Sequence, residues 1–510
     1  MKTPIVYIIG AGPGDPWLIS VRGLRALAKA DVVIYDHLVH PRLLRQARPE
    51  AERIDVGPAA PEPLEQEAIC YLLAEKAREG KVVARLKWGD PFVFDRGGEE
   101  ALFLHEHAVR FEVIPGIPGA IAVPAYAGIP ITYPGGGDTV TFVRGHESEH
   151  SKPPRVDWAS LHELDGTVVC YCGSTQLPGI LDSMLSHGWS RDESAALVFN
   201  GTLPEQETIQ CTVGELADMA RQPKFTNHAM LIVGRVTALR EHLRWFDARP
   251  LFGKRIVVTR PREQAADLVE ALEQLGATVI EAPTVRIVPP EDFAPLDDAC
   301  AKVGQYDWIV FTSANGVDYF FDRMHAGTTD VRALAGVKLC AIGPGTADRL
   351  AQHGLKVDLV PREFRAEAVV EALRATGDLT GKAFLLPRAD IARELLAEEL
   401  RKSGGLVTEV TAYRTVSVEI ERDGEPDIYR MLLDRKVDVL TFTSASTVRN
   451  FVRLYGVEPV ADLLQPVAIA SIGPVTAEAA QQCGIRTTIM PPEYTIPGLV
   501  RAIVEYFERA

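Results

Sequence analysis

Three glycines occupy alternate positions in a loop that directly follows the apolar run VYII. Gly10, Gly12 and Gly14 carry no Cβ, so the backbone there can adopt positive φ and approach a ligand closely. The G-x-G-x-G spacing differs from the G-x-G-x-x-G fingerprint of dinucleotide-binding loops, and Pro13 removes a backbone donor that a phosphate would use. The loop therefore argues against NAD. It leaves two alternatives open, a pocket for another ligand or a plain turn from strand to helix.

Charged side chains follow two further apolar runs in the same half of the chain. Asp36 ends the run DVVIYD, and Asp90 lies in the turn WGDP after the run VVARLK. Arg96 and Glu99 then open a helical stretch whose first turn is acidic, as the helix dipole favours. Open α/β sheets bind ligands at the carboxyl ends of their strands, so we expect these loops to enclose a small molecule.

The elements that must position these residues alternate between strands and helices. The run at 6–10 is followed by a helical pattern at 23–30, an apolar run at 31–36 and a further helix and strand within 65–87. This order is typical of βαβ units and predicts an α/β fold with a parallel sheet. The stretch 111–137 is dense in Pro and Gly, and we expect a long shaped loop there without regular elements.

Strand-like runs separated by turn residues continue from Thr139 to about Trp245 and predict a second subdomain. The segment 246–252, DARPLFG, precedes a fresh apolar run and is expected to be a linker. A chain of 510 residues exceeds the size of one hydrophobic core, so two or more domains are expected.

Composition narrows the classes of function. The net charge of −15 disfavours nonspecific nucleic-acid binding, although it permits an anionic small substrate at a local basic cluster. Seven cysteines without a C-x-x-C motif favour reduced thiols over a zinc site or a disulfide framework. The first apolar run is too short to span a membrane. These features predict a cytoplasmic enzyme without a metal site.

The second half of the chain repeats itself. FTSANGVDYFFD begins at residue 311 and FTSASTVRNFVR at 442, while AIGPGTADRL begins at 341 and SIGPVTAEAA at 471. Weaker similarity links the segments that begin at 253 and 381. Each copy alternates strands with helices, so a duplicated domain with two α/β lobes is expected.

Hydroxyl groups recur at matching positions of this repeat. Ser313, Thr346, Ser444 and Thr476 follow strand-like runs, where hydroxyls and helix N-terminal amides could bind substrate carboxylates. For each residue alone, a helix N-cap is the simpler interpretation, but the pairing across the repeat favours a functional role. Tyr413 follows another strand-like run and could donate a proton, although such a tyrosine usually serves packing.

Motifs in the first half resemble those of the uroporphyrinogen-III C-methyltransferases. This similarity covers roughly residues 4–245 and rests on GAGPGDP, YDHLV, RLKWGDPFVFDRGGEE, PAYAGIPIT and NGTLPEQ, in that order. These enzymes are S-adenosylmethionine-dependent tetrapyrrole methylases of the siroheme and cobalamin pathways. The resemblance implies a two-subdomain methylase fold, a homodimer formed through this half, and methylation of uroporphyrinogen III at C2 and C7 to give precorrin-2.

The resemblance also implies roles for single residues. Asp36 matches a proton-accepting carboxylate, and Arg96 and Glu99 match residues near the substrate. The positions that match the cofactor site are Pro13, Gly89, Asp90, Val93, Gly119, Ala120, Cys172, Gly201 and Ala229. The chain departs from the family pattern at one of these positions, Cys172, and at several others, namely Pro58, Trp88, Pro118, Tyr133 and Pro134. These departures leave open that this half methylates a different tetrapyrrole or is a non-catalytic scaffold.

The second half resembles uroporphyrinogen-III synthase over about residues 252–508, through the paired FTS and IGP motifs, AYRT and YTIPGLV. This similarity implies a two-lobe α/β fold in which the chain crosses between the lobes. It also implies cyclisation of hydroxymethylbilane to uroporphyrinogen III without a cofactor, with Tyr413 assisting loss of the hydroxyl. Tyr413 and Thr476 match positions that face the cleft.

The two resemblances predict a bifunctional enzyme, because the product of one half is the substrate of the other. We expect a methyltransferase at 1–245, a linker at 246–252 and a synthase at 253–510. Its expected partners are tetrapyrroles, with neither nucleic acid nor membrane. A tetrapyrrole-sensing protein is the alternative outside enzymes, and the lack of a basic helix-turn-helix segment disfavours it.

Overall fold

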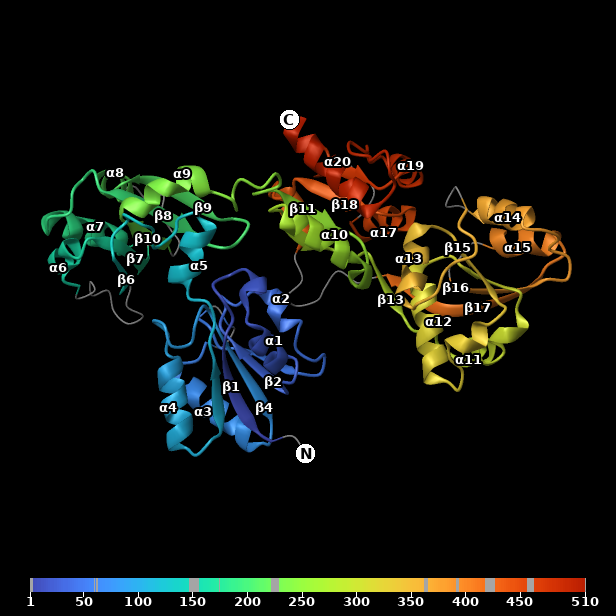
Figure 1. Ribbon diagram of the computed structural model, residues 1–510, viewed down its shortest axis with the longest axis horizontal. Coiled ribbons are helices and arrows are strands. Elements are labelled where there is room, and N and C mark those ends of the chain that lie inside the picture. The colour runs from blue at the N-terminus through green and yellow to red at the C-terminus, as the bar shows by residue number, and fades with distance from the viewer. Residues whose placement is uncertain are drawn as a thin grey trace. The chain divides into compact units, whose positions relative to one another are not determined.

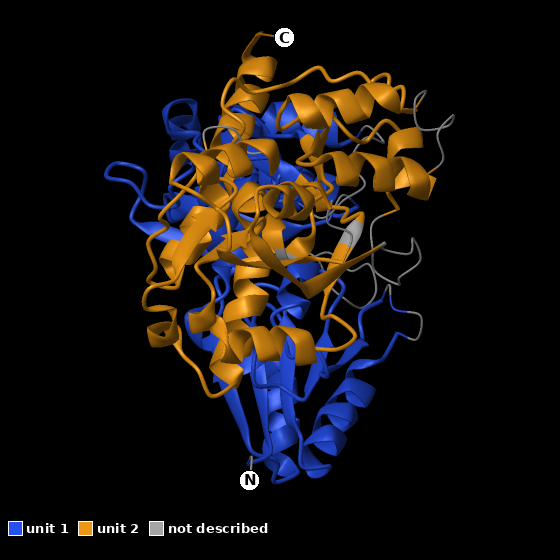
Figure 2. Cartoon of the chain, turned by 90° about the vertical axis from the view of Figure 1, so that its right-hand side faces the viewer, with its two compact units in different colours: residues 1–254, 272–278 blue, residues 255–271, 279–510 orange. Residues whose placement is uncertain are grey.

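The computed structural model describes residues 3–58, 60, 63–145, 156–173, 175–221, 229–361, 366–390, 394–417, 427–455 and 463–509. The chain forms two compact units (Figure 2). Unit 1 comprises Met1–Lys254 and Leu272–Thr278, and unit 2 comprises Arg255–Ala271 and Val279–Ala510. Among the described residues, no helix carries an apolar stretch long enough to cross a bilayer.

The first sheet of unit 1 is parallel, as the sequence predicts, with the strand order β3-β2-β4-β1-β5. Its strands are β1 (Ile5–Gly10), β2 (Val32–Tyr35), β3 (Glu52–Asp55), β4 (Val82–Lys87) and β5 (Phe111–Ile114). Helices cover both faces, with α1 (Val21–Leu27) and α2 (Pro41–Leu44) on one side and α3 (Gln66–Arg78) and α4 (Gly97–Glu106) on the other (Figure 1). A short 3-10 turn, η1 (Pro16–Leu18), precedes α1.

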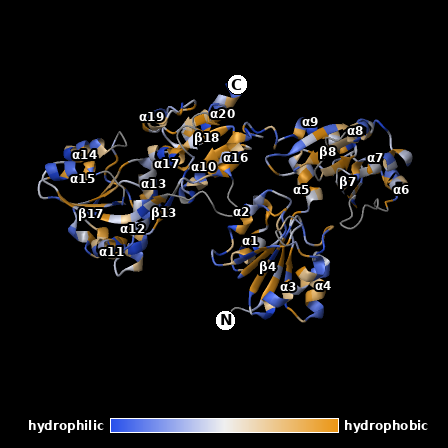
Figure 3. Ribbon diagram, turned by 180° about the vertical axis from the view of Figure 1, so that it is seen from behind, coloured by the Kyte–Doolittle hydropathy of each residue, from blue (hydrophilic) through white to orange (hydrophobic). Residues whose placement is uncertain are grey.

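Strand β4 lies in the middle of this sheet, and all six of its residues are buried. Its apolar residues pack on both faces, and Figure 3 shows it as a largely apolar element among the helices. Arg85 and Lys87 are the exceptions, since both are charged and both are buried. They continue the row of Val83, whose side chain packs with residues of α3 and α4. The sheet therefore brings two cations to the face covered by α3 and α4, near its carboxyl end.

The expectation of an irregular segment at 111–137 is wrong in part. Strand β5 and helix α5 (Gly119–Tyr126) both lie within it. Pro118 is the N-cap of α5, where its missing N–H costs no intrahelical hydrogen bond. Pro124 lies inside the helix and removes one backbone hydrogen bond there. Burial of Ala120 and Val123 in an apolar cluster offsets the lost hydrogen bond. The helix therefore forms although its Pro and Gly residues favour a loop.

The second sheet of unit 1 is mixed, with the strand order β6-β7-β10-β8-β9. Its strands are β6 (Thr139–Arg144), β7 (Gly166–Cys172), β8 (Ser194–Phe199), β9 (Glu207–Thr212) and β10 (Ala229–Val233). Strand β9 has no fully buried residue and lacks an apolar run in its sequence. One face packs on α6 (Trp158–Glu163), α7 (Leu177–Ser186) and α8 (Val213–Ala220), and the other on α5.

The end of the first half packs back onto unit 1. It contains η2 (Arg235–Leu239) and α9 (Arg240–Leu243), followed by the segment expected to be a linker. Phe246 and Leu251 of that segment are buried. The Phe246 ring lies 4.7 Å from that of Tyr126, measured between centroids.

Unit 2 contains two sheets, with the orders β12-β11-β18-β19 and β13-β17-β16-β14-β15. The first sheet takes β11 (Arg255–Val258) and β12 (Thr278–Glu281) from one copy of the repeat and β18 (Val439–Phe442) and β19 (Ala468–Ser471) from the other. The second sheet consists of β13 (Val285–Val288), β14 (Trp308–Phe311), β15 (Lys338–Ala341), β16 (Ala383–Ala389) and β17 (Leu406–Ser417). The chain therefore crosses between lobes, and the lobes do not follow the repeat.

Helices alternate with these strands as the repeat predicts. They are α10 (Arg262–Gln274), α11 (Ala294–Ala301), η3 (Val303–Gln305), α12 (Ala314–Ala326), η4 (Val331–Leu334), α13 (Pro344–Gln352), α14 (Ala366–Ala375), α15 (Leu395–Lys402), α16 (Ile428–Leu433), α17 (Ala445–Tyr455), α19 (Pro474–Gln482) and α20 (Ile496–Arg509). Each FTS motif ends a strand and begins a helix, α12 in one copy and α17 in the other.

Candidate functional site

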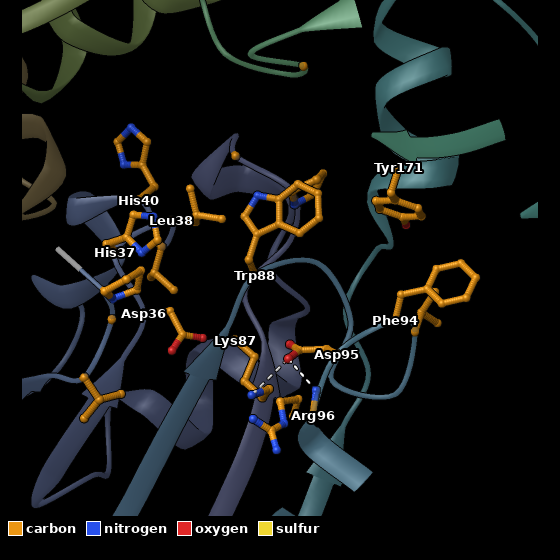
Figure 4. Close-up of a pocket in the computed structure, with 18 of the residues that line it drawn as sticks. Asp36, His37, Leu38, His40, Lys87, Trp88, Phe94, Asp95, Arg96 and Tyr171 are labelled. Atoms are coloured by element: carbon orange, nitrogen blue, oxygen red, sulfur yellow. Dashed lines mark hydrogen bonds and ion pairs between the residues drawn. The ribbon is translucent and has the colours of Figure 1, made fainter. Parts of the chain in front are cut away.

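Unit 1 contains a pocket of about 940 Å³ (Figure 4). Loops after β1, β2 and β4 form one wall, and residues of β7, β8, β10 and the loop after β8 form the other. The volume is at the upper end of the ~300–1,000 Å³ typical of small-molecule sites. The carboxyl edge of the first sheet therefore carries the pocket, where the parallel topology predicts a ligand site.

The pocket brings together seven of the predicted site residues of the first half. They are Pro13, Asp36, Val93, Arg96, Cys172, Gly201 and Ala229. Among the described residues, five others that were predicted do not line it, namely Gly89, Asp90, Glu99, Gly119 and Ala120. Pro58 and Trp88, two departures from the family pattern, are part of the lining.

Gly89 and Asp90 shape the loops behind the pocket. A Cβ on Gly10 would lie 2.7 Å from the carbonyl oxygen of Gly89 and 2.4 Å from the backbone nitrogen of Gly116, so only glycine fits there. Gly89 has a φ of 66° and exchanges two backbone hydrogen bonds with Gly12. Asp90 accepts hydrogen bonds from the backbone N–H of Phe92 at 2.8 Å and of Gly116 at 2.9 Å.

Gly119 and Ala120 begin helix α5 beside the aromatic wall of the pocket. The backbone N–H of Ala120 donates to the Tyr171 hydroxyl at 2.8 Å. A Cβ on Gly119 would lie 2.6 Å from the Trp88 ring, so glycine allows this close approach. Trp88 and Phe94 both pack edge-on against Tyr171, with centroids 6.3 Å and 5.4 Å away.

This aromatic wall, formed by Trp88, Phe94 and Tyr171, belongs to the pocket lining. Phe94 has a φ of 53°, an unfavourable backbone conformation for an aromatic residue, and its side chain remains exposed. The wall offers flat apolar surface opposite the charged floor of the pocket (Figure 4).

The floor of the pocket is a network of charges in which Arg85, Lys87 and Glu100 are buried and the two aspartates are half-buried. Arg85 Nη2 donates to Asp36 Oδ1 at 2.8 Å, and Arg85 Nε donates to Glu100 Oε1 at 3.2 Å. Lys87 Nζ lies 2.9 Å from the same Glu100 oxygen and 3.1 Å from Asp95 Oδ1. Three carboxylates thus face two cations. Among the described residues, Glu100 Oε2 has no hydrogen-bond partner.

The carboxyl groups of this network differ in their proton affinity. Burial alone would raise the pKa of Glu100, but Arg85 and Lys87 bring it below its ordinary value. For Asp95, burial dominates and raises the pKa, although Lys87 opposes it. Asp36 lines the pocket at the end of β2 and is held by Arg85 from below.

Arg96 and Glu99 form an exposed ion pair at the start of α4. Arg96 Nη2 donates to Glu99 Oε2 at 2.7 Å, and these hydrogen bonds lower the pKa of Glu99. Arg96 lines the pocket and Glu99 lies behind it. Across the pocket, burial lowers the pKa of His40 to about 4, with a smaller contribution from Arg42.

The predicted residues of the second half fall into two groups. Ser313 and Ser444 lie at helix N-termini, where their hydroxyls accept the backbone N–H of Gly316 at 3.0 Å and of Thr447 at 3.3 Å. Thr346 and Thr476 lie in the first turns of α13 and α19 and are buried. Their assignment as substrate-binding residues stays a prediction.

Tyr413 lies on β17, and its hydroxyl shares a hydrogen bond of 2.9 Å with Ser313 Oγ. Burial raises the pKa of this phenol, while the hydrogen bonds of Ser313 and Asn315 oppose the shift. The structure thus joins two residues that the sequence analysis singled out one hundred positions apart.

Several pocket residues escaped the sequence analysis, among them Arg85, Lys87, Phe94, Asp95 and Tyr171. The alternation Arg85-x-Lys87 within an otherwise apolar strand was an available signal, since buried cations in a central strand require partners. Tyr171 gave no such signal, because its strand is buried on both faces and its sequence does not distinguish them.

Two family models match different parts of the chain. The family model "Tetrapyrrole (Corrin/Porphyrin) Methylases" matches residues 5–217, and the model "Uroporphyrinogen-III synthase HemD" matches residues 266–501.

Three relatives illustrate the range of similarity. The chain is 36% identical over 506 residues to "Porphyrin biosynthesis protein HemD" of Ruminiclostridium josui, covering 99% of this chain and 98% of the relative. It is 34% identical over 380 residues to "Uroporphyrinogen-III C-methyltransferase" of Bacillus subtilis, covering 74% and 78%. A "Siroheme synthase" of Thiobacillus denitrificans is 41% identical over 279 residues, covering 54% of each chain.

Proposed function

The chain belongs to the porphyrin-biosynthesis family in which a tetrapyrrole methylase is fused to a uroporphyrinogen-III synthase, and we propose that it performs both reactions. Its second half cyclises hydroxymethylbilane to uroporphyrinogen III. Its first half methylates that product at C2 and C7 to precorrin-2, with S-adenosylmethionine as the methyl donor. The presence of both enzyme families in one chain carries this proposal, since one reaction supplies the substrate of the other.

The pocket of unit 1 fits a positively charged methyl donor. Gly14 and Gly201 expose backbone on facing walls, Cys172 and Ala229 add small side chains, and carboxylates lie on the floor. S-Adenosylmethionine would supply an electrophilic methyl group on a sulfonium. The protein residues bind and align the two reactants and exclude water, which is the main requirement of a direct displacement.

Asp36 is the proposed proton acceptor. Transfer of the methyl group to a pyrrole carbon of the substrate would break the sulfonium S–C bond, release S-adenosylhomocysteine and leave a cationic ring that must lose one proton. Asp36 lines the pocket, and a 2.8 Å hydrogen bond from Arg85 fixes the orientation of its carboxylate. Arg96 is proposed to bind a substrate carboxylate; its position in the pocket lining and its ion pair with Glu99 support this role.

Tyr413 is the proposed acid of the synthase half. Its phenol is buried next to Ser313, and burial keeps it protonated, as a proton donor to a departing hydroxyl must be. Ser313, Thr346, Ser444 and Thr476 are proposed to bind substrate carboxylates through hydroxyls and helix N-terminal amides. This half is proposed to need no cofactor.

The proposal is tested by giving each half its own substrate. The purified chain should transfer methyl groups from labelled S-adenosylmethionine to uroporphyrinogen III, and it should convert hydroxymethylbilane to the type III isomer without added cofactor. Labelling of a different tetrapyrrole would redirect the methylase assignment. Tight tetrapyrrole binding without either reaction would favour a sensing protein.

We further propose domain boundaries at 1–245, 246–252 and 253–510, a homodimer formed through the first half, and a role in siroheme synthesis in the cytoplasm. The main change of compact unit after Lys254 supports the boundary between the halves, with Leu272–Thr278 as a short return to unit 1, and the siroheme synthase relative supports the pathway. All seven cysteines are free, as in a reducing compartment. Light scattering of the purified chain tests the dimer.

A further inference from the structure

A closed ring of hydrogen bonds joins two loops from different sheets of unit 1. The first loop follows β1 and ends at Asp15, and the second follows β8 and contains Thr202 and Gln206. The backbone N–H of Asp15 donates to Thr202 Oγ1 at 3.0 Å. The backbone N–H of Thr202 in turn donates to Gln206 Oε1 at 2.9 Å.

Tyr126, the last residue of helix α5, closes this ring. Gln206 Nε2 donates to the Tyr126 carbonyl oxygen at 3.3 Å, and the Tyr126 hydroxyl donates to Asp15 Oδ2 at 2.7 Å. Asp15, Tyr126, Gln206 and Thr202 therefore each contact two neighbours in one cycle, which we call the Asp15 ring.

The Asp15 ring lies directly behind the pocket. Its own members do not belong to the described lining, but Gly14, Gly201 and Leu203, which adjoin Asp15 and Thr202 in the chain, do. A Cβ on Gly14 would lie 2.7 Å from Thr202 Oγ1, so the two loops touch. The ring thus connects one wall of the pocket to the other.

The second loop depends on such contacts for its shape. Asn200 and Thr202 have φ values of 47° and 71°, in the left-handed region that residues with a Cβ adopt at a cost. Thr202 and Gln206 are buried, and the four bonds satisfy polar groups that would otherwise be unpaired there. Loss of one of these hydrogen bonds should therefore weaken the contacts that keep the second loop in its strained conformation.

We propose that the Asp15 ring positions the two walls of the pocket and so sets its affinity for the methyl donor without touching it. This role rests on the proposed function. Without the ring, the loops occupy the binding geometry for a smaller fraction of the time. The apparent affinity for the methyl donor falls in proportion to that fraction. Asp15, Tyr126, Thr202 and Gln206 are then positioning residues.

The test compares binding of S-adenosylhomocysteine to the full chain and to the variants Tyr126→Phe and Thr202→Val by calorimetry. Each variant removes one bond of the ring, and the Phe ring retains the packing of Tyr126 against Trp245 and Phe246. We expect the dissociation constant to rise about tenfold in each. The double variant should bind no more weakly than either single variant, because one break opens the ring.

Tyr71→Phe is the matched control. Tyr71 is an exposed tyrosine on α3 outside the pocket lining, and its variant should bind like the wild type. Unchanged affinity in the ring variants, with only a lower unfolding temperature, would mean that the ring is merely structural. Losses that add in the double variant would also overturn the proposal. A wild-type chain that does not bind S-adenosylhomocysteine would overturn the proposed function as well.

Discussion

Burial raises the pKa of Asp95, whereas the pKa of Glu100 beside it is lowered by Arg85 and Lys87. A raised pKa means that the folded protein favours the protonated form, so the contribution of Asp95 to stability is present in acid. It is lost as the pH rises through the folded-state pKa. At neutral pH the charged carboxylate therefore opposes folding, and Lys87 offsets only part of that effect.

The variant Asp95→Asn should accordingly stabilise unit 1 at neutral pH. We expect its urea midpoint to exceed that of the wild type near pH 8, and the difference to shrink as the pH falls toward the ordinary pKa of 3.8. Chemical unfolding across this pH range measures the effect. A variant that is less stable than the wild type at every pH would contradict this account of the pocket floor.

A second prediction concerns Asp90, which shapes the pocket without lining it. Asp90→Ala removes the two hydrogen bonds to the backbone of Phe92 and Gly116. We expect weaker S-adenosylhomocysteine binding, by about tenfold or more, and unchanged cyclisation of hydroxymethylbilane. Asp182→Ala, at an exposed carboxylate on α7, is the control. Loss of both activities would mean that the two halves are not independent.

At this scale, motifs located the pocket better than they assigned contacts. Asp36 was predictable because it directly follows strand β2 of a parallel sheet, and Arg96 because it ends the loop between β4 and α4. Gly89 and Ala120 were grouped with them by resemblance, yet they act one layer behind the lining. Whether a residue lines a cavity depends on the local backbone path, which spacing in the sequence does not specify.

At the scale of elements, strand β4 and helix α4 are joined through one buried carboxylate. Glu100 of α4 accepts hydrogen bonds from Arg85 and Lys87 of β4 and from Gln66 of α3. Helix α4 therefore fixes the cations under the pocket, while its first residues extend from the loop that carries Asp95 and Arg96.

Glu100→Ala should strongly destabilise unit 1, because it leaves Arg85 and Lys87 buried with fewer opposing charges. A loss of about 3–5 kcal/mol is typical when one partner of a buried ion pair is removed. Urea unfolding measures it, with Glu106→Ala at the exposed end of the same helix as the control. A decrease in the free energy of unfolding below about 1 kcal/mol would contradict this expectation, because it would show that water or rearranged side chains solvate Arg85 and Lys87 in place of Glu100.

Elements were predictable where the apolar pattern was strong. Strands β1 and β2 are apolar runs that end in a glycine or acidic turn, and β4 is apolar except for Arg85 and Lys87; the structure has all three strands as predicted. Helix α5 was not predictable from its own residues, because Pro124 and the flanking glycines indicate a loop. Its apolar contacts with the second sheet stabilise the helix instead.

At the scale of the whole molecule, each compact unit carries one set of proposed catalytic residues. Unit 1 holds the pocket with Asp36, and unit 2 holds the Ser313 and Tyr413 pair. The sequence repeat predicted two lobes in unit 2. The assignment of strands to sheets required the structure, because β11 and β18 come from different copies and still pair.

Because the sites lie in different units, single substitutions should separate the activities. Asp36→Asn should abolish most methyl transfer, on the order of 100-fold or more, and leave cyclisation intact. Tyr413→Phe should slow cyclisation, with methylation of supplied uroporphyrinogen III unchanged. Separate rate measurements with the two substrates check both variants. A variant that lowers both rates equally would contradict the assignment of the sites.

The most direct test of the central claim supplies the substrate of the first reaction and follows both reactions in one experiment. The purified chain is incubated with hydroxymethylbilane, with and without S-adenosylmethionine, and the products are identified by chromatography and mass spectrometry. We expect uroporphyrinogen III without the donor and its dimethylated product with it. Failure to form the type III ring would contradict the synthase assignment, and type III product that never gains methyl groups would contradict the methylase assignment.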